Sequence, residues 1–116
     1  MKMDLLGQDW FKTAAARMDW AAARQKALAE NVANADTPHY IGRDVVSFED
    51  HLARAERRGE VATEEANNSW GGSFNGNMVT VEEQMMFSNE AAGSYKLATS
   101  LYKKGHSLLA IAASAR

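Results

Sequence analysis

The sequence predicts an all-α dominated fold in which two long terminal helices pack as an antiparallel, coiled-coil-like hairpin, with a middle segment of extended chain, short helix and loop. Small and apolar residues recur at alternating spacings of three and four near both ends of the chain. Its single proline directly follows the first of these stretches. At 116 residues we expect one domain, 1–116, divided into 9–35, 36–79 and 80–113.

Residues 9–35 are predicted to form the first long helix. Asp9 is the expected N-cap, and neither Gly nor Pro interrupts the run. One seam has alternating spacings of three and four: Phe11, Ala14, Met18, Ala21, Gln25, Leu28, Val32 and Ala35. From it, Phe11, Met18, Leu28 and Val32 are predicted to mediate helix pairing and assembly. The many alanines on other faces favour helix and let neighbours approach closely.

The helix is predicted to stop abruptly in the stretch "ADTPHY". Asp36 and Thr37 favour local side-chain hydrogen bonds over helix, and Pro38 pushes the residue before it out of the α region. The β-branched and aromatic residues between 40 and 46 then favour extended backbone.

A short helix is expected next. Ser47 and Asp50 resemble a capping box, Phe48 and Leu52 share one side, and Gly59 fits the helix stop.

Residues 59–79 are rich in Gly, Asn, Ser and Glu, so we expect disorder or partner-dependent order there. The pair Asn75-Gly76 is also compatible with a small hairpin. Because an exposed Trp is costly, Trp70 is expected to become buried on assembly.

The second long helix is predicted over 80–113. Thr80 and Glu83 form a capping box pattern, with two acidic residues in the first turn. A second seam follows: Val81, Met85, Ser88, Ala92, Tyr95, Thr99, Tyr102, His106, Leu109 and Ala113. Its members predicted to mediate pairing and assembly are Val81, Met85, Tyr95, Tyr102 and Leu109. Other apolar residues occupy a different face, and a lone helix pair cannot cover both, which favours a component of an assembly.

Composition excludes several classes of function. A net charge of −2 provides no basic field for nucleic acid, and there is no cysteine for disulfides or thiolate metal sites. No apolar run approaches the roughly 20 residues that span a bilayer, so no membrane insertion is expected, and no secretory signal is recognised. His39, His51 and His106 lack metal-ligand spacing, and no strained nucleophile turn appears. We therefore expect no enzyme activity, cofactor or metal.

Two motifs resemble those of a known family. The stretches "AENVANADTPHY" and "RDVVSF" closely resemble the signature at the end of the N-terminal helix in bacterial flagellar rod and hook proteins. "GNMVTVEEQM" is similar to the motif that begins their C-terminal helix. The signature positions are Asn31, Asn34, Asp36, Thr37, Pro38, Tyr40, Arg43 and Asp44. The resemblance leaves 51–75 unsupported, and His39 stands where the family usually has Gly.

The resemblance implies a structural subunit of the proximal rod of the flagellar basal body, which assembles helically around the export channel and transmits torque from the membrane ring toward the hook. Implied partners are copies of itself, other rod subunits, the membrane-ring protein and the rod-ring junction adaptor. It also implies passage through the flagellar type III export gate to the periplasmic space without a cleaved signal peptide.

Two interpretations of individual motifs stay open. "FEDHL", with Phe48 and Leu52, is similar to an export-gate motif, but a Phe–Leu pair at this spacing is also ordinary helix packing. Asn31 and Asn34 fit either surface groups near a helix end or groups that cap the helix or bond to a neighbouring subunit.

The alternative function is a soluble coiled-coil adaptor or export chaperone that binds one partner helix. It explains the two seams but not the two family motifs.

Overall fold

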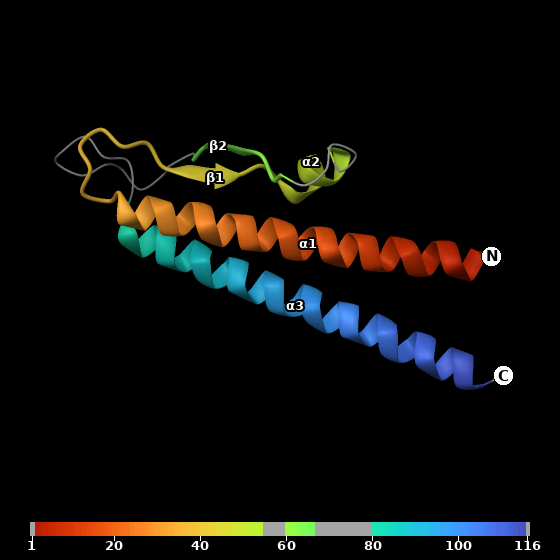
Figure 1. Cartoon of the computed structure of the whole chain (residues 1–116). Helices are drawn as coiled ribbons and strands as arrows, with labels where there is room; N and C mark the ends of the chain where they lie inside the picture. Colours follow the sequence, from red (N-terminus) through yellow and green to blue (C-terminus); the bar gives the residue numbers. More distant parts are fainter. Residues whose placement is uncertain (1, 55–59, 67–79, 116) are drawn as a thin grey trace.

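The computed structural model describes residues 2–54, 60–66 and 80–115. In chain order the elements are α1 (Lys2–Ala33), β1 (Arg43–Val45), α2 (Phe48–Ala53), β2 (Thr63–Glu65) and α3 (Val81–Ser114). The two long helices lie side by side and run in opposite directions in an elongated molecule of 66 × 25 × 19 Å (Figure 1). This arrangement confirms the predicted fold class.

The first helix starts earlier than the sequence predicts. It begins at Lys2, so Asp9 lies inside α1 and is not its N-cap. A single interior glycine, here Gly7, costs about 1 kcal/mol relative to alanine, which the hydrogen bonds of the added turns offset. At the other end α1 finishes at Ala33, and the backbone N–H of Ala35 bonds to the carbonyl of Val32 in a tighter final turn.

The seam predicted on α1 is buried only in part, because its member Val32 is 41% exposed. Ala14, Ala21 and Leu28 are buried, at spacings of seven residues. Phe11 meets Tyr102 edge to face, with ring centroids 4.9 Å apart. These contacts place small side chains at the closest approach of the two helices, with larger groups beside them.

On α3, the buried face differs from the predicted seam. The buried residues beyond the first turn recur every seven positions: Gln84, Ala91, Ala98 and Gly105. The predicted seam alternates between positions one residue and four residues beyond these, which corresponds to rotations of about 100° and about 40°. Its member Tyr102 still meets Phe11 of α1. The prediction followed large apolar side chains, whereas the close approach of two helices selects Ala and Gly. In this chain, Val81, Met85, Tyr95 and Leu109 are each more than one-third exposed; their predicted contact with neighbouring subunits stays a prediction.

A segment that we call the arm, residues 40–54, lies along α1 and contains β1 and α2 (Figure 1). The N-terminus of α2 is capped as predicted, because Oγ of Ser47 accepts from the backbone N–H of Asp50 at 3.1 Å. Trp20 and Ala21 of α1 form a small core with Val45 of the arm.

The strand β2 was not predicted. It pairs antiparallel with β1 in the register Arg43↔Glu65, Asp44↔Glu64 and Val45↔Thr63. Three exposed residues in a polar stretch carry no recognisable strand pattern, and the pairing depends on the neighbouring strand. Residues 60–66 therefore have an ordered place where a loop was expected, while Trp70 and Asn75-Gly76 lie outside the described residues.

The predicted capping box of α3 is wrong in its Thr80 half. Thr80 has the extended backbone of an N-cap but makes no side-chain capping hydrogen bond. Its hydroxyl is buried and has no partner within the described part of the chain. Glu83, the other member, is buried at 3% exposure. In the first turn the backbone N–H of Gln84 donates to the carbonyl of Thr80 at 3.1 Å.

Candidate functional site

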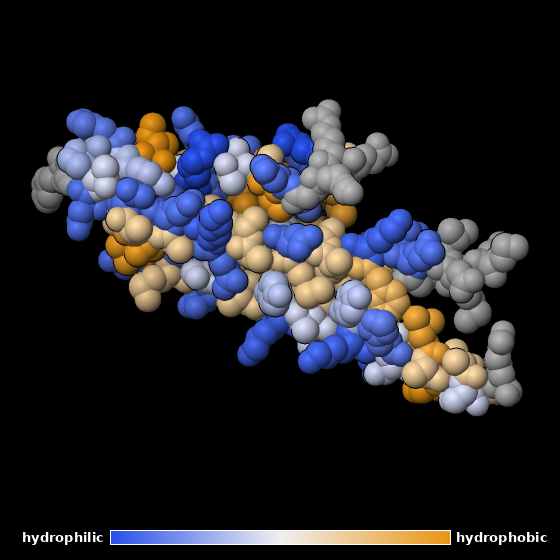
Figure 2. Space-filling model, in the orientation of Figure 1, coloured by the Kyte–Doolittle hydropathy of each residue, from blue (hydrophilic) through white to orange (hydrophobic). Residues whose placement is uncertain are grey.

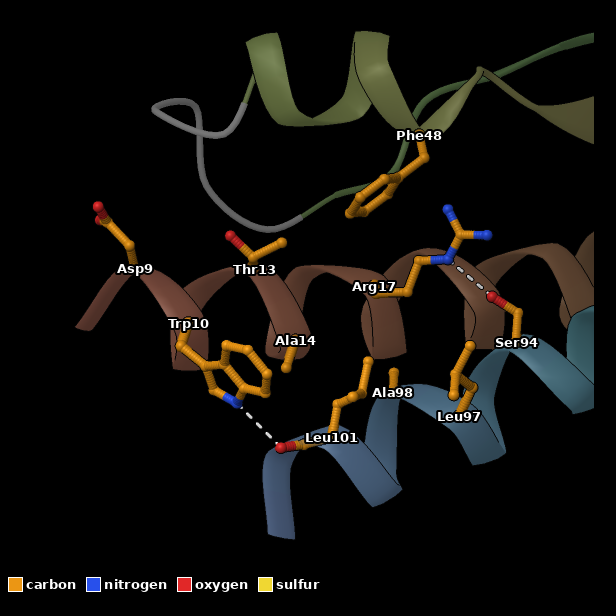
Figure 3. A pocket seen from close by; sticks show the side chains of 10 residues that line it. All are labelled: Asp9, Trp10, Thr13, Ala14, Arg17, Phe48, Ser94, Leu97, Ala98 and Leu101. Carbon is orange, nitrogen blue, oxygen red and sulfur yellow. Dashed lines mark hydrogen bonds between the residues drawn. The ribbon is translucent and has the colours of Figure 1, made fainter. Parts of the chain in front are cut away.

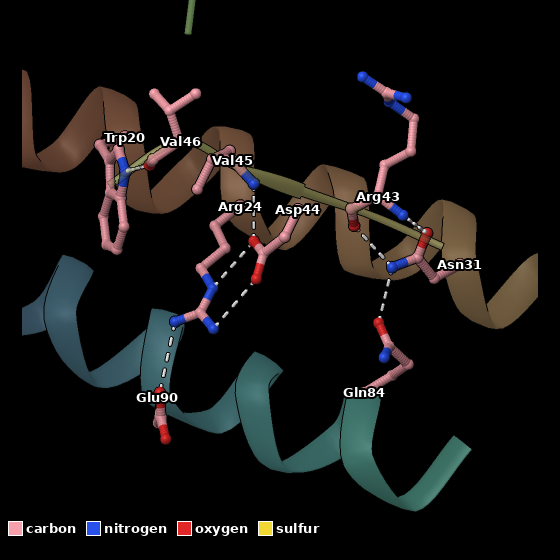
Figure 4. Close-up of polar contacts among 9 residues, drawn as sticks. All are labelled: Trp20, Arg24, Asn31, Arg43, Asp44, Val45, Val46, Gln84 and Glu90. Carbon is pink, nitrogen blue, oxygen red and sulfur yellow. Dashed lines mark hydrogen bonds and ion pairs between the residues drawn. The ribbon is translucent and has the colours of Figure 1, made fainter. Parts of the chain in front are cut away.

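Asn31, near the end of α1, is fully buried, with 0% exposure. Its amide nitrogen donates to the carbonyl of Arg43 and to Oε1 of Gln84, each at 2.7 Å. Its amide oxygen accepts from the backbone N–H of Arg43 at 2.9 Å and from the hydroxyl of Tyr40 at 3.2 Å. The amide thus uses two donors and two acceptor positions, and it joins α1 to both α3 and the arm (Figure 4). These bonds lie within one chain, so the predicted surface, capping or inter-subunit role is wrong for Asn31.

Asn34 serves the end of the helix. Its side-chain nitrogen donates to the carbonyl of Glu30 at 2.9 Å, and its side-chain oxygen accepts from the hydroxyl of Thr37 at 3.2 Å. The backbone N–H of Thr37 also reaches the carbonyl of Asn34 at 3.0 Å. The two signature asparagines therefore do different work: Asn34 closes the helix locally, and Asn31 holds distant segments.

Residues 37–40 form a β-turn that reverses the chain after α1. The backbone N–H of Tyr40 donates to the carbonyl of Thr37 at 3.2 Å. Pro38 occupies the second position, and His39 takes φ 62° at the third. Among the common turn types, proline followed by a residue of positive φ fits type II, where glycine is preferred. His39 thus adopts the left-handed conformation that glycine takes readily, and the turn is kept at a cost in backbone strain.

Arg24 forms a second link between the same three segments. Its guanidinium makes a two-pronged contact with Asp44 of the arm, Nε to Oδ1 at 3.2 Å and Nη2 to Oδ2 at 3.3 Å. Nη1 donates to Glu90 of α3 at 3.3 Å. The side chains of Arg24 and Asp44 are only 14% and 24% exposed, so this pair is better shielded from water than a surface ion pair (Figure 4).

Arg43 holds the strand pair from outside. Its side chain is exposed and donates to both the hydroxyl and the carbonyl of Thr63, at 3.2 and 2.9 Å. The signature residues Arg43 and Asp44 therefore point in different directions, one to β2 and one to α1. Asp36 lies exposed in the turn region.

The two residues of the export-gate motif have different environments. Phe48 is half-buried, with its ring 5.9 Å from that of Trp20, edge to face, whereas Leu52 is 38% exposed. The indole N–H of Trp20 donates to the carbonyl of Val46 at 2.7 Å and so anchors the same part of the arm. In the folded chain Phe48 packs against Trp20, whereas part of the Leu52 side chain is exposed and can contact another protein.

A row of large apolar side chains is exposed along α3. The aliphatic members are Met85, Met86, Leu97, Leu101, Leu108, Leu109 and Ile111. The space-filling view shows hydrophobic surface along the elongated molecule and at one end of it (Figure 2). Leu97 and Ile111 are the most open, at 61% and 63% exposure. These side chains have no cover within the described chain.

An apolar groove of about 600 Å³ runs between α1 and α3 beside α2. Trp10, Phe48, Leu97 and Leu101 line it, with Arg17 reaching across to the hydroxyl of Ser94 at 2.7 Å (Figure 3). At its outer end the indole N–H of Trp10 donates to the carbonyl of Leu101 at 2.9 Å.

The histidines are dispersed. Within the described ranges, no three His, Cys, Asp or Glu side chains gather where they could hold a metal ion. His51 is buried beside Phe48, and the His106 ring lies 4.6 Å from that of Phe11 and 5.0 Å from that of Tyr102. Among the helices described, none combines the length and apolar character needed to cross a bilayer.

Sequence reasoning missed Trp20, Arg24, Gln84 and Gly105, although all four organise the site. Arg24 and Asn31 stand seven residues apart, and this repeat in polar residues was a usable signal. The sequence gives no such signal for Gln84 or Gly105, because neither belongs to an apolar seam.

No family model matches the chain. It is similar to a curated protein of Agrobacterium fabrum (strain C58), the flagellar basal body rod protein FlgB, with 29% identity over 118 aligned residues. The alignment covers 85% of this chain and 88% of the relative.

The protein that this chain is similar to is a flagellar rod protein. The similarity to FlgB extends over most of both proteins, well beyond the turn motif. The FlgB relationship agrees with the two terminal motifs and with the paired helices that connect them.

Proposed function

We propose that this chain is a structural subunit of the proximal rod of a bacterial flagellar basal body. In this role it assembles helically around an export channel with copies of itself and other rod subunits, transmits torque from the membrane ring toward the hook, and performs no catalysis. Its further partners are the membrane-ring protein, the rod-ring junction adaptor and the flagellar type III export gate. It acts in the periplasmic space, which it reaches without a cleaved signal.

The observation that carries the proposal is the exposed apolar row on α3. Thirteen large hydrophobic residues of the described chain are exposed: Trp10, Val32, Ile41, Leu52, Val81, Met85, Met86, Tyr95, Leu97, Leu101, Leu108, Leu109 and Ile111. Single exposed apolar residues are normal, but this many along one helix are typical of a surface that meets other proteins. In a chain similar to FlgB, neighbouring subunits are the simplest cover.

The composition of the core supports the same proposal. Leu28 and Asn31 are the only large side chains of the described residues that are exposed by less than 2%. The rest of the buried apolar set is mainly alanine. Long helices draw most of their stability from packing, so a pair with this narrow contact gains from further helices around it.

Circular dichroism with sedimentation velocity on the purified chain is the first test. Weak helicity and a non-compact monomer would support a rod subunit whose helices need neighbours. A highly helical dimer or tetramer that melts cooperatively would instead favour the soluble adaptor or export chaperone, for which the groove beside α2 would be the binding site for a partner helix.

The test can be sharpened in a flagellated bacterium that carries this chain as its sole copy. Replacing Leu97 and Ile111 together by Ser should abolish swimming and incorporation into the basal body, because it removes apolar contacts with neighbouring subunits. Both side chains are mostly exposed, so the change should leave the fold of the single chain intact. Lys103→Ser, also exposed on α3, is the matched control and should swim normally. Normal swimming of the Leu97/Ile111 double variant would contradict assembly through this face.

A further inference from the structure

Three polar side chains of α1 stand at intervals of seven residues, and each contacts both α3 and the arm: Arg17, Arg24 and Asn31. We call this set the ladder. We propose that the ladder couples docking of the arm to pairing of α3, so that the arm is held more firmly in a chain whose two helices are paired. The inference concerns the isolated chain and does not rest on the proposed function.

The contacts to α3 run in antiparallel order. Arg17 donates from Nε to Oγ of Ser94 at 2.7 Å, and Arg24 donates from Nη1 to Glu90 at 3.3 Å. The third is the Asn31 bond to Gln84, at 2.7 Å. Ascending positions on α1 thus meet descending positions on α3.

The contacts to the arm follow the same order. The guanidinium carbon of Arg17 lies 4.7 Å from the centroid of the Phe48 ring. Arg24 binds the carboxylate of Asp44, and Asn31 binds the backbone of Arg43 on both its N–H and its carbonyl. One set of side chains therefore fixes the register of both neighbours along α1.

Shielding from solvent turns these shared contacts into coupling. Asn31 is fully buried, and the Arg24 side chain is 14% exposed, so either would lose hydrogen bonds without full replacement by water if one neighbour were absent. Each ladder side chain also loses its conformational entropy only once for two sets of contacts. When the second neighbour binds, the side chain is already fixed and no further entropy is lost. Such coupling is reciprocal: α3 must stabilise the arm as much as the arm stabilises α3.

Amide hydrogen–deuterium exchange of the full chain, in trimethylamine N-oxide to favour the folded state, tests the proposal. Gln84→Leu removes a group of α3 that reaches the arm through Asn31. It should accelerate exchange of arm residues 43–46 about tenfold, since a buried donor loses its acceptor. Asp44→Ala, on the arm, should accelerate exchange of residues 84–98 on α3 by a similar factor. Lys96→Ala, exposed on α3 and outside the ladder, should change neither.

The double variant separates coupling from simple loss of stability. Gln84→Leu with Asp44→Ala should accelerate arm exchange by clearly less than the product of the two separate factors, because each change already breaks the same ladder. Ala98→Gly weakens the same helix contact away from the ladder and should combine with Asp44→Ala multiplicatively. The proposal is overturned if Gln84→Leu leaves arm exchange unchanged, or if its factor and that of Asp44→Ala simply multiply. Amides of arm residues 43–46 that are not protected from exchange in the parent chain overturn it as well, since the ladder would then not keep the arm docked.

Discussion

At the scale of single residues, a buried side-chain amide does work that an apolar residue at the same position could not. A leucine at residue 31 would satisfy the apolar periodicity of α1. It would, however, leave the side-chain oxygen of Gln84 and both backbone groups of Arg43 without the bonds that Asn31 now makes. Buried polar groups without partners are costly, so this position selects a residue with two donors and two acceptor sites.

Replacing Asn31 should therefore be among the most damaging single changes. We expect Asn31→Leu to lower the free energy of unfolding by about 3 kcal/mol or more, as several buried groups lose their partners at about 1–3 kcal/mol each. Urea unfolding followed by circular dichroism in trimethylamine N-oxide measures it. Asn34→Ala, which removes the bonds to Glu30 and Thr37 at the helix end, is the control and should cost about 1 kcal/mol. Equal effects of the two changes would contradict the distinct roles assigned to the asparagines.

The turn offers a prediction of opposite sign. His39 has φ 62°, a region that costs a residue with a Cβ about 1–2 kcal/mol. His39→Gly removes that strain but adds freedom to the unfolded chain, so the net gain should be about 0.5–1 kcal/mol. Urea unfolding measures the gain, and His39→Val should lose stability in the same experiment, because a β-branched side chain fits this region poorly. Destabilisation by glycine would show that the imidazole itself makes a stabilising contact.

At the scale of elements, two glycines of α3 have opposite environments. A Cβ added at Gly105 would lie 2.6 Å from Nε1 of Trp10, while one added at Gly93 would meet nothing within 4 Å. Gly105 therefore allows α3 to approach the ring of Trp10, and Gly93 is an ordinary exposed helical glycine.

The two alanine variants should separate accordingly. Gly93→Ala should raise the free energy of unfolding by about 0.5–1 kcal/mol through helix propensity alone. Gly105→Ala gains the same propensity but must displace the indole, so it should lose stability and shift the Trp10 indole N–H resonance in an NMR spectrum. A Gly105→Ala variant as stable as Gly93→Ala, with that resonance unmoved, would show that the contact yields easily.

The element scale also shows how far the sequence could be interpreted. Periodicity correctly predicted two long helices, the buried row Ala14, Ala21 and Leu28, and the cap at Ser47, because these depend on local pattern. The contact face of α3 was predicted correctly only in part, because heptad reasoning follows large apolar groups and the buried positions here are mostly Ala and Gly. The strand β2 and the bonds of Asn31 depend on partners distant in sequence, which local pattern does not reveal.

At the scale of the whole molecule, the chain is an elongated pair of helices with a docked arm and more apolar surface than it covers (Figures 1 and 2). The arm carries the Phe–Leu pair that resembles an export-gate motif, and its two residues differ in how the fold uses them. Phe48 packs on Trp20, whereas Leu52 is 38% exposed. This difference allows export and packing to be tested separately.

Leu52→Ala should lower the free energy of unfolding by only about 1 kcal/mol, because the side chain is partly exposed in the fold. If the motif is recognised by the export gate, the same variant should reach the culture supernatant in clearly smaller amounts than the parent when both are expressed equally in a flagellated host. Leu97→Ala, which is exposed on α3 outside the motif, serves as the control and should be exported normally. Parental export of Leu52→Ala would assign the Phe–Leu spacing to helix packing alone, whereas a selective loss would mean that the gate reads this residue before the arm folds.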